Sequence, residues 1–349
     1  VMRSRQMLME PAFPEDEYAK LKEQSLNQLR LGQESPSTVA SNELTTAVYG
    51  NSVLGKYATP ESLEKVTLED VKTFYKSVYR PNDAIVIVSG DVSVERGREL
   101  ATKLIDGWQS GDLPKVTVEL PKKPTTRRII IVDRPEGAGA TVRMAVPGYD
   151  VHQEIKFAGA VANQVLNSTG IDGRFMKYVR AEKGLCYGCG GAFRPNRQAG
   201  LFSASVDTKI ETAGEAIEAM FKVMSDMRSK PVTDLEINEA RSRVAGGMVM
   251  GIQTIGAQAG YRVDGILNDY PIDYYDKYPS RIAKVAKDEV QKVMQEYVDD
   301  GMMTIVVVAP AAAVKPQLEK LGTVEVVPMP SKRKGAATQP DREMLKKAA

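Results

Sequence analysis

The sequence predicts an α+β protein made of two homologous domains, and three observations support this prediction. Segments with apolar residues at helical spacing alternate with a few short β-branched runs, such as the one at 84–89. A chain of 349 residues is too long for one ordinary core and suits two domains. Finally, residues of the first half recur, in similar form, at a constant distance in the second half.

That constant distance indicates an internal duplication. Over residues 13–90 the offset is 219 positions without a gap, which a single insertion would have destroyed. The matched positions are Glu17 with Glu236, Lys22 with Arg241, Val66 with Val285, Val71 with Val290, and 86–88 with 305–307. We therefore expect a repeated unit of about 219 residues.

The duplication also predicts that the first copy is incomplete at its N-terminal side. The second copy begins near Arg127, so the first lacks roughly its first 90 residues. Either the chain is a truncated or processed fragment, or another polypeptide completes its first domain. Missing strands would leave an open sheet edge that needs covering.

The domain boundaries follow from composition. Residues 1–110 form the first domain and 126–328 the second. The linker is placed at 111–125, where Pro114, Pro121 and Pro124 interrupt any regular structure. Residues 329–349 form a polar, basic tail that is typical of a solvated, disordered end.

In the first half the sequence predicts helices over 13–30 and 37–49. Acidic residues open the first of them, which suits the helix dipole. A capping box, Thr67 with Asp70, opens a helix that ends near 79. A turn at 80–83 leads to a buried strand over 84–89, and a helix follows over 94–108.

In the second half, strands are predicted over 128–132, 140–146, 201–207 and 303–308. Helices are expected over 154–168, 212–228 and 287–298. The capping box Thr233–Glu236 opens a further long helix. A tyrosine-rich loop is expected around 270–278, and the apolar stripe Ile217, Met220, Phe221 and Met224 is expected to face the core.

Composition excludes several functional classes. A net charge of +2 gives no case for a nucleic-acid partner, which usually requires a concentrated basic face. The chain lacks an uninterrupted apolar run of about 18 residues, so no membrane span is predicted. The hydrophobic fraction of 42% and the charged fraction of 26% are ordinary for a globular protein.

The two cysteines, Cys186 and Cys189, do not predict a zinc site, because the chain adds only one histidine, His152. On a regular strand an odd offset places the two thiols on opposite faces. Packing is the favoured interpretation and redox chemistry the alternative. His152 lies in a polar turn and is expected at the surface.

The candidate site lies in residues 173–187, GRFMKYVRAEKGLCY. The pattern predicts a helix that starts after Gly173 and ends at Gly184, which suits a left-handed helix end. An extended run then leads to Tyr187. Arg180 in the last helical turn and Tyr187 on the returning strand are thereby brought together.

These residues, the tandem α+β halves and the stretch YRPNDAIVIVSGDVS resemble the insulinase/pitrilysin-type zinc metallopeptidases over about residues 13–310. The two-subunit members, such as the mitochondrial processing peptidase, have the most similar layout. The resemblance implies domains with a mainly antiparallel sheet and helices packed on one face. It also implies that Arg180 and Tyr187 are the catalytic and substrate-binding pair, which grips the substrate carbonyl and its oxyanion.

The zinc half of the family pattern is missing. The family's inverted motif, H-x-x-E-H, needs two histidines, and its third ligand, a Glu, would fall near Asn27 or Gln28. An amide is a poor zinc ligand in such a site. We therefore expect no metal on this chain and zinc in a homologous partner subunit.

The leading hypothesis is a zinc-free, substrate-binding subunit of a heterodimeric metalloendopeptidase that acts on peptides. An inactive scaffold of the same fold, like the core subunits of respiratory complexes, is the alternative, and a fragment of one longer zinc-bearing chain is a third possibility. Bacterial relatives are often periplasmic or cell-envelope proteins, which is a weak indication of compartment. Peptide specificity is not encoded in any motif.

Overall fold

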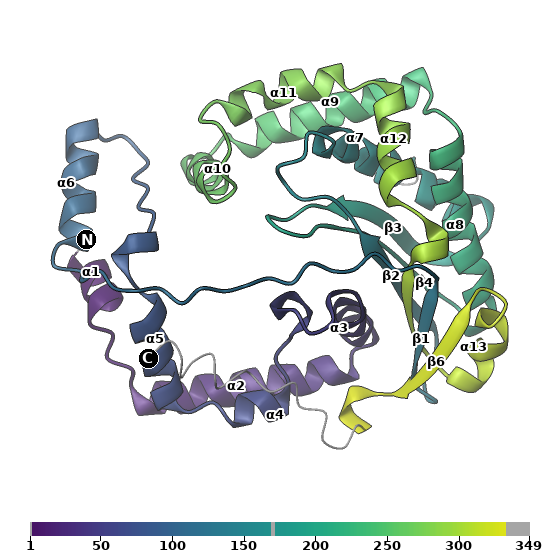
Figure 1. The fold of residues 1–349 in the computed structure, drawn as a ribbon, viewed down its shortest axis with the longest axis horizontal. Helices are drawn as coiled ribbons and strands as arrows, with labels where there is room; N and C mark the ends of the chain where they lie inside the picture. Colours follow the sequence, from purple (N-terminus) through teal and green to yellow (C-terminus); the bar gives the residue numbers. More distant parts are fainter. Residues whose placement is uncertain (1, 169–171, 333–349) are drawn as a thin grey trace.

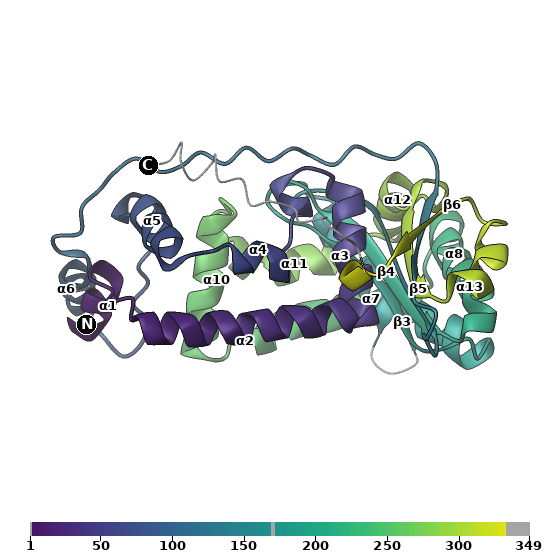
Figure 2. The ribbon, with the colours of Figure 1, turned by 90° about the horizontal axis from the view of Figure 1, so that it is seen from below.

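The first half of the protein is helical and the second half is built on one six-stranded sheet (Figure 1). The computed structural model describes residues 2–168 and 172–332. The helices of the first half are α1 (Met2–Met9), α2 (Glu15–Glu34), α3 (Pro36–Tyr49), α4 (Pro60–Glu64), α5 (Leu68–Val78) and α6 (Val94–Ile105). Neither helix nor strand occurs over 106–127, which in Figure 2 runs as an extended segment along the molecule.

The second half contains all the strands that the structure describes. They are β1 (Arg128–Asp133), β2 (Ala140–Pro147), β3 (Cys186–Arg194), β4 (Leu201–Thr208), β5 (Thr304–Ala309) and β6 (Thr323–Pro328). Their order is β3-β4-β2-β5-β1-β6. The pairs β3–β4, β4–β2 and β2–β5 are antiparallel, whereas β1 pairs with β5 and β6 in parallel. The sheet is thus mainly antiparallel, and the α+β prediction is confirmed.

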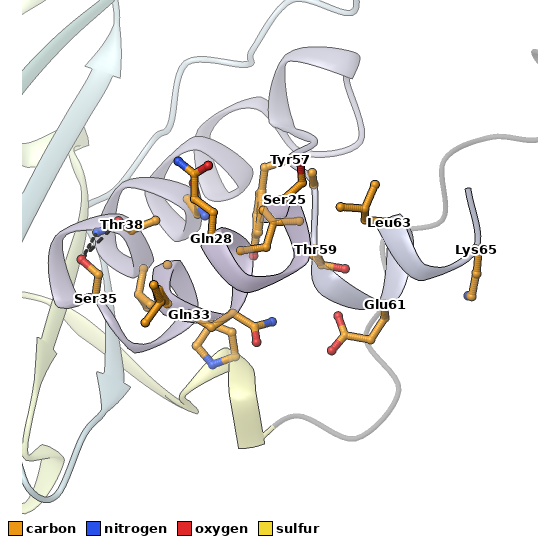
Figure 3. A pocket seen from close by; sticks show the side chains of 17 residues that line it. Ser25, Gln28, Gln33, Ser35, Thr38, Tyr57, Thr59, Glu61, Leu63 and Lys65 are labelled. Carbon is orange, nitrogen blue, oxygen red and sulfur yellow. Dashed lines mark hydrogen bonds between the residues drawn. The ribbon is translucent and has the colours of Figure 1, made fainter. Parts of the chain in front are cut away.

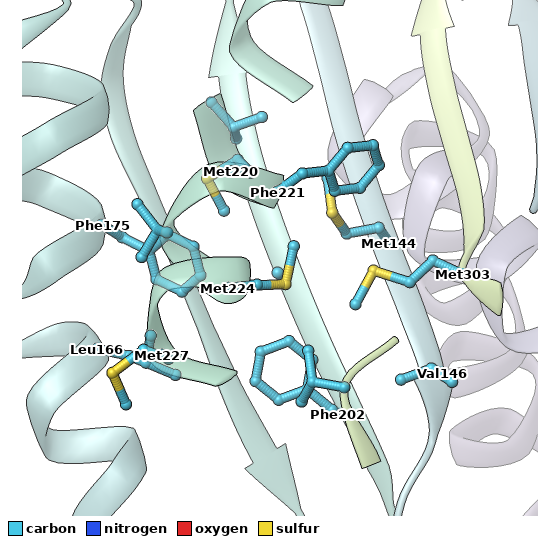
Figure 4. Close-up of a cluster of buried hydrophobic side chains, with 14 of the residues drawn as sticks. Met144, Val146, Leu166, Phe175, Phe202, Met220, Phe221, Met224, Met227 and Met303 are labelled. Atoms are coloured by element: carbon cyan, nitrogen blue, oxygen red, sulfur yellow. The ribbon is translucent and has the colours of Figure 1, made fainter. Parts of the chain in front are cut away.

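One face of this sheet carries the main core. The helices around it are α7 (Lys156–Asn167), α8 (Ala213–Ser229), α9 (Asp234–Gly251), α11 (Tyr274–Lys284), α12 (Lys287–Tyr297) and α13 (Ala311–Leu318). The methionine stripe of α8 faces inward as expected, and Met220 and Met224 are fully buried beside Phe175 and Phe202 (Figure 4). Methionine suits this position because its unbranched side chain fills irregular gaps between larger rings.

The opposite face of the sheet is covered by a helix of the first half. Val39, Ala40 and Leu44 of α3 form a second cluster with the alternate residues of β1 and β5, among them Ile130 and Val306. Because both faces are covered, these strands are apolar at successive positions, as in buried strands generally. The Tyr49 hydroxyl also donates to Ala199 O at 2.9 Å, which ties α3 to the second half.

The predicted strand over 84–89 is not formed, and this expectation was wrong. The segment is extended but unpaired, and Ile85, Val86 and Val88 are exposed. At an offset of 219 it corresponds to β5, whose neighbours β1 and β2 supply its hydrogen bonds. Residues 2–127 contain no strand that could do the same, so the β-branched run has no ladder to join.

The tyrosine-rich segment was predicted as a loop, but Tyr274, Tyr275 and Tyr278 lie in α11, where their rings contact one another and Tyr270 stacks on Tyr274 at 4.0 Å. Burial of aromatic area thus favours a helix over tyrosine's weak helix propensity. The sequence predicts a basic tail over 329–349, of which residues 333–349 lie outside the described residues.

Candidate functional site

Arg180 is positioned by a π-helix rather than by the regular helix that the sequence predicts. The segment Met176–Glu182 is π-helical, and Lys183 N bonds to Tyr178 O at 3.0 Å, five residues back. Val179 is fully buried and anchors the segment against the core. Gly184 ends it with φ +66°, as expected for a left-handed helix end. Such π segments occur frequently at functional sites.

A partly buried ion pair holds the start of this segment. Arg174 donates to Glu236 through Nε–Oε1 at 2.7 Å and Nη2–Oε2 at 2.9 Å. Glu236 also accepts from Thr233 N at 2.8 Å, which completes the predicted capping box of α9. Burial raises the pKa of the Glu236 carboxyl, but the bonds from Arg174 and Thr233 outweigh it and lower that pKa to about 2.

Tyr187 is positioned by a β-bulge in β3. Cys186 pairs with Thr208 of β4 and Gly188 pairs with Asp207, so Tyr187 is an extra residue without a partner. The extra residue turns its side chain outward, and Tyr187 is 85% exposed. The sequence gives no sign of this bulge apart from the glycines that follow.

The structure brings Arg180 and Tyr187 together, as predicted. The guanidinium carbon lies over the Tyr187 ring, 4.9 Å from its centroid, in a cation–π contact. Among the described residues, neither side chain takes part in a hydrogen bond or an ion pair. An ion pair with Glu182 would be a purely structural role for Arg180, and no such contact is formed between these two residues.

The bulge also overturns the expectation for the cysteines. Cys186 pairs with Thr208 and Cys189 with Val206, two residues apart on β4, so both cysteines face the same side of the sheet. Both pack against the main core. One inserted residue changes an odd offset into an even one, which is why the thiols do not point to opposite faces.

The free edge of β3 is fixed by two asparagines that the sequence analysis missed. Asn163 of α7 accepts from Phe193 N at 2.7 Å and donates to Phe193 O at 3.0 Å. Asn167 makes the same two bonds with Gly191, at 3.0 and 2.7 Å. The amides thus replace a neighbouring strand. Their spacing of four residues on one helix face is the signal that could have identified them.

The region of the expected third zinc ligand contains amides rather than carboxylates. Gln28, together with Gln33 and Asn42, lines a hollow of about 930 Å³ between α2, α3 and α4 (Figure 3). Glu61 is the one acidic residue among the described residues that line it. Asn27 is exposed on α2, and His152 is exposed in its turn. Within 2–168 and 172–332 no three His, Cys, Asp or Glu residues lie together in a way that could hold a metal ion.

Comparison with protein families identifies the family of this chain. The profile described as "Peptidase M16 inactive domain" matches residues 65–244, just over half of the chain, and the match includes Arg180 and Tyr187. The chain belongs to the M16 peptidase family. The resemblance to zinc metallopeptidases is thus confirmed, and the part of the family that is matched is its inactive domain.

Relatives of this chain are named both as a non-peptidase and as a zinc protease. "Non-peptidase homolog YmxG" of Helicobacter pylori is 19% identical over 314 residues, which cover 88% of this chain and 71% of that protein. "Uncharacterized zinc protease YmxG" of Bacillus subtilis is 19% identical over 254 residues, covering 72% and 61%. This chain therefore spans about two thirds of the length of these relatives.

Solved structures show the same fold. The M16 inactive domain from Pseudomonas fluorescens superposes with a TM-score of 0.81 at 22% identity, covering 88% of this chain and 73% of that one. A protease from Helicobacter pylori gives 0.74 at 17% identity, covering 84% and 72%. Within the described residues no helix has the length and apolar character needed to cross a membrane, in line with the sequence prediction.

Proposed function

We propose that this chain is the zinc-free, substrate-binding subunit of a heterodimeric M16 metalloendopeptidase, with zinc in a homologous partner. One observation carries the proposal: an exposed tyrosine whose hydroxyl has no partner among the described residues lies against an arginine that is also unpaired. Polar groups in this state are available to bind a ligand, and a guanidinium held in place by an aromatic ring is partly pre-organised.

The geometry suits stabilisation of an oxyanion. The Arg180 guanidinium carbon lies over the Tyr187 ring, and no N–H donor of this guanidinium is hydrogen-bonded to a described residue. A phenol O–H and these donors can together bind the carbonyl oxygen of a peptide bond and the negative charge that develops on it. The attacking hydroxide would come from zinc on the partner subunit.

The lack of zinc ligands at the expected position supports this division of roles. Asn27 and Gln28 occupy that position, and the one carboxylate in the nearby hollow, Glu61, has no histidine beside it within the described residues. A partner is supported by exposed apolar side chains at the C-terminal part of α9 and on α10 (Ile255–Leu267). They are Val249, Met250, Ile255, Ile266 and Leu267, each at least half exposed.

We also propose that the two halves are copies of one domain. At the offset of 219, α2 and α9 start at equivalent positions, as do α3 and α10, and α5 coincides with α12 over its whole length. A side-chain bond recurs as well. Lys22 donates to Val66 O at 2.7 Å, and Arg241 donates to Val285 O through Nε at 2.8 Å. Both bonds tie the equivalent long helix to the equivalent loop.

Hydrolysis of a quenched fluorescent peptide tests the function. The chain would be assayed alone and then with its zinc-bearing homologue, with the metal content of each subunit measured. We expect activity only in the mixture and zinc only in the partner. Tyr187→Phe keeps the ring on Arg180 but removes the hydroxyl, so turnover of the complex should fall about 100-fold. Tyr79→Phe, at another exposed tyrosine, is the matched control.

An inactive scaffold is the second candidate, and the name "Non-peptidase homolog" of the Helicobacter relative favours it. A scaffold would form a stable complex without supporting hydrolysis. It would also be indifferent to Arg180→Ala. A stable complex with no turnover in any mixture would therefore replace our proposal with this one. Unchanged turnover in the Tyr187→Phe and Arg180→Ala complexes would instead remove the proposed role of the pair.

A further inference from the structure

A second hollow, of about 820 Å³, lies between α1, α2 and α5, and the proposed function does not use it. We call it the α2–α5 hollow. Its apolar lining includes Leu21 of α2, Val71 of α5, and Leu63 and Val66 from the chain between these helices. Leu21 is 58% exposed although it belongs to this apolar lining. Contiguous apolar surface of this kind marks an interaction site more often than a single exposed residue does.

The lining of the α2–α5 hollow corresponds to core residues of the second half. At the offset of 219, the equivalent pairs are Leu21 with Ala240, Leu63 with Ile282, Val66 with Val285, and Val71 with Val290. Each second-half member is at most 4% exposed and belongs to the main core. None of the four first-half members is buried. The two halves thus carry the same apolar pattern, but only the second half covers it.

The cover in the second half is α7. It packs against both α9 and α12, the helices equivalent to α2 and α5 (Figure 1). Its inward face consists of apolar residues at helical spacing, namely Phe157, Ala158, Val161, Ala162, Val165 and Leu166. Subtracting 219 from 156–167 gives no residue of this chain. Among the described residues, the first half therefore has no counterpart of α7.

We propose that the α2–α5 hollow is the docking site of an amphipathic helix of the α7 type, supplied by a partner polypeptide. A groove with an aliphatic lining takes the apolar face of such a helix, and the polar face of the helix stays in solvent. The docked helix would give the first half the layer that α7 gives the second. This inference rests on the proposed duplication and not on the proposed peptidase role.

Two observations favour a polypeptide over a lipid as the occupant. Val86 and Val88 of the unpaired segment 84–89 are exposed, and their equivalents Ile305 and Val307 lie in the main core together with α7. A polypeptide can cover the hollow and also offer backbone partners to this segment, which a lipid cannot do. The charges on the described lining are also mixed, which does not suit an anionic headgroup. They belong to Arg3, Lys22, Glu10 and Glu17.

The probe is a fluorescein-labelled peptide with the sequence of residues 153–168, which contains α7, and its binding to the full chain is followed by anisotropy. We expect saturable one-to-one binding and a gain in helical circular dichroism, because a free peptide of this length is mostly unfolded. Leu21→Asp should weaken binding about 10–100-fold, since it replaces an apolar contact by a charge. Leu31→Asp is the matched control, because Leu31 is exposed on the same helix but outside this hollow.

Two further variants keep the test independent of the introduced charge on the chain. Leu21→Ser should weaken binding by about 10-fold, and its exposed position makes loss of the fold unexpected. A peptide with Val161→Asp and Val165→Asp has lost its apolar face and should not bind. Circular dichroism of each chain variant verifies that its fold matches the wild type.

The proposal is overturned if the peptide does not bind, if both Leu21 variants bind it as the wild type does, or if only Leu31→Asp weakens binding. Saturable binding of decanoate without binding of the peptide would identify a lipid site instead. A wild-type dimer that Leu21→Asp dissociates, measured by analytical ultracentrifugation, would make a second copy the occupant. Since hydrolysis is not measured, failure here leaves the proposed peptidase role unaffected.

Discussion

Replacing Glu236 by glutamine should destabilise the protein, because this carboxylate pairs with Arg174 at the start of the π-helix. The glutamine amide can still accept the Thr233 N–H bond of the α9 cap, but it has no negative charge to pair with Arg174. A carboxyl pKa lowered from 4.5 to about 2 corresponds to about 3 kcal/mol at neutral pH. The Glu236 side chain is 28% exposed, so solvent screens part of this interaction free energy. We expect a loss of about 2 kcal/mol.

The pH dependence has a definite sign. The folded-state pKa of Glu236 lies below its unfolded value, so the stabilisation is fully present above about pH 5 and is lost as pH falls from 4.5 toward 2. The difference in unfolding free energy between wild type and Glu236→Gln should accordingly be about 0.5 kcal/mol smaller at pH 4 than at pH 8.

Urea denaturation at several pH values, followed by circular dichroism, measures this difference. Glu239→Gln is the matched control, because Glu239 lies on the same helix, is exposed and makes no ion pair among the described residues. It should change the unfolding free energy by less than about 0.5 kcal/mol. Equal effects of the two substitutions, or a gap that widens toward pH 4, would refute the assignment of the stabilisation to the ion pair.

Two further pairs of variants test how the site is built. Gly184→Ala should lower the unfolding free energy by about 1 kcal/mol, because φ is +66° at this position. Gly188→Ala should be nearly neutral, because the space around Gly188 is open and its φ is not positive. Equal shifts of the melting temperature in the two variants would contradict this. Asn167→Ala should cost about 1–3 kcal/mol, because it removes the partners of Gly191 N–H and C=O, while Asn27→Ala on exposed α2 should not. Hydrogen exchange at the Gly191 amide should accelerate in Asn167→Ala, and an unchanged rate would mean that another group protects it.

Much of the fold follows from local signals in the sequence. The capping boxes at Thr67 and Thr233 mark the starts of α5 and α9, and both are formed as expected. The β-branched runs predict β1 and β5, because strands covered on both faces need continuous apolar residues. The run at 84–89 shows the limit of this reasoning, since a strand also needs neighbours to pair with.

Local sequence signals likewise predict only part of the candidate site. The helix–glycine–strand pattern correctly brings Arg180 to Tyr187, because a left-handed glycine reverses the chain locally. The exposure of Tyr187 and the common face of the cysteines depend on a bulge, whose position is set by the register with β4. Asn163 and Asn167 likewise become meaningful only once α7 lies along β3. Their four-residue spacing shows only that they share a helix face, and the strand that they meet is set by long-range packing.

Two irregular segments set the geometry of the candidate site. The π-helix and the bulge each add one residue to a regular element. Together they move Arg180, Tyr187 and the two cysteines out of the positions that regular structure would give them. Insertions of this kind cost stability unless the surroundings hold them. Here the Arg174–Glu236 pair fixes the start of the π-helix, and the Asn167–Gly191 bonds hold β3 beyond the bulge. Because Glu236 and Asn167 lie outside the Arg180–Tyr187 pair, substitutions there should change the geometry of the site without removing a group that would contact a substrate.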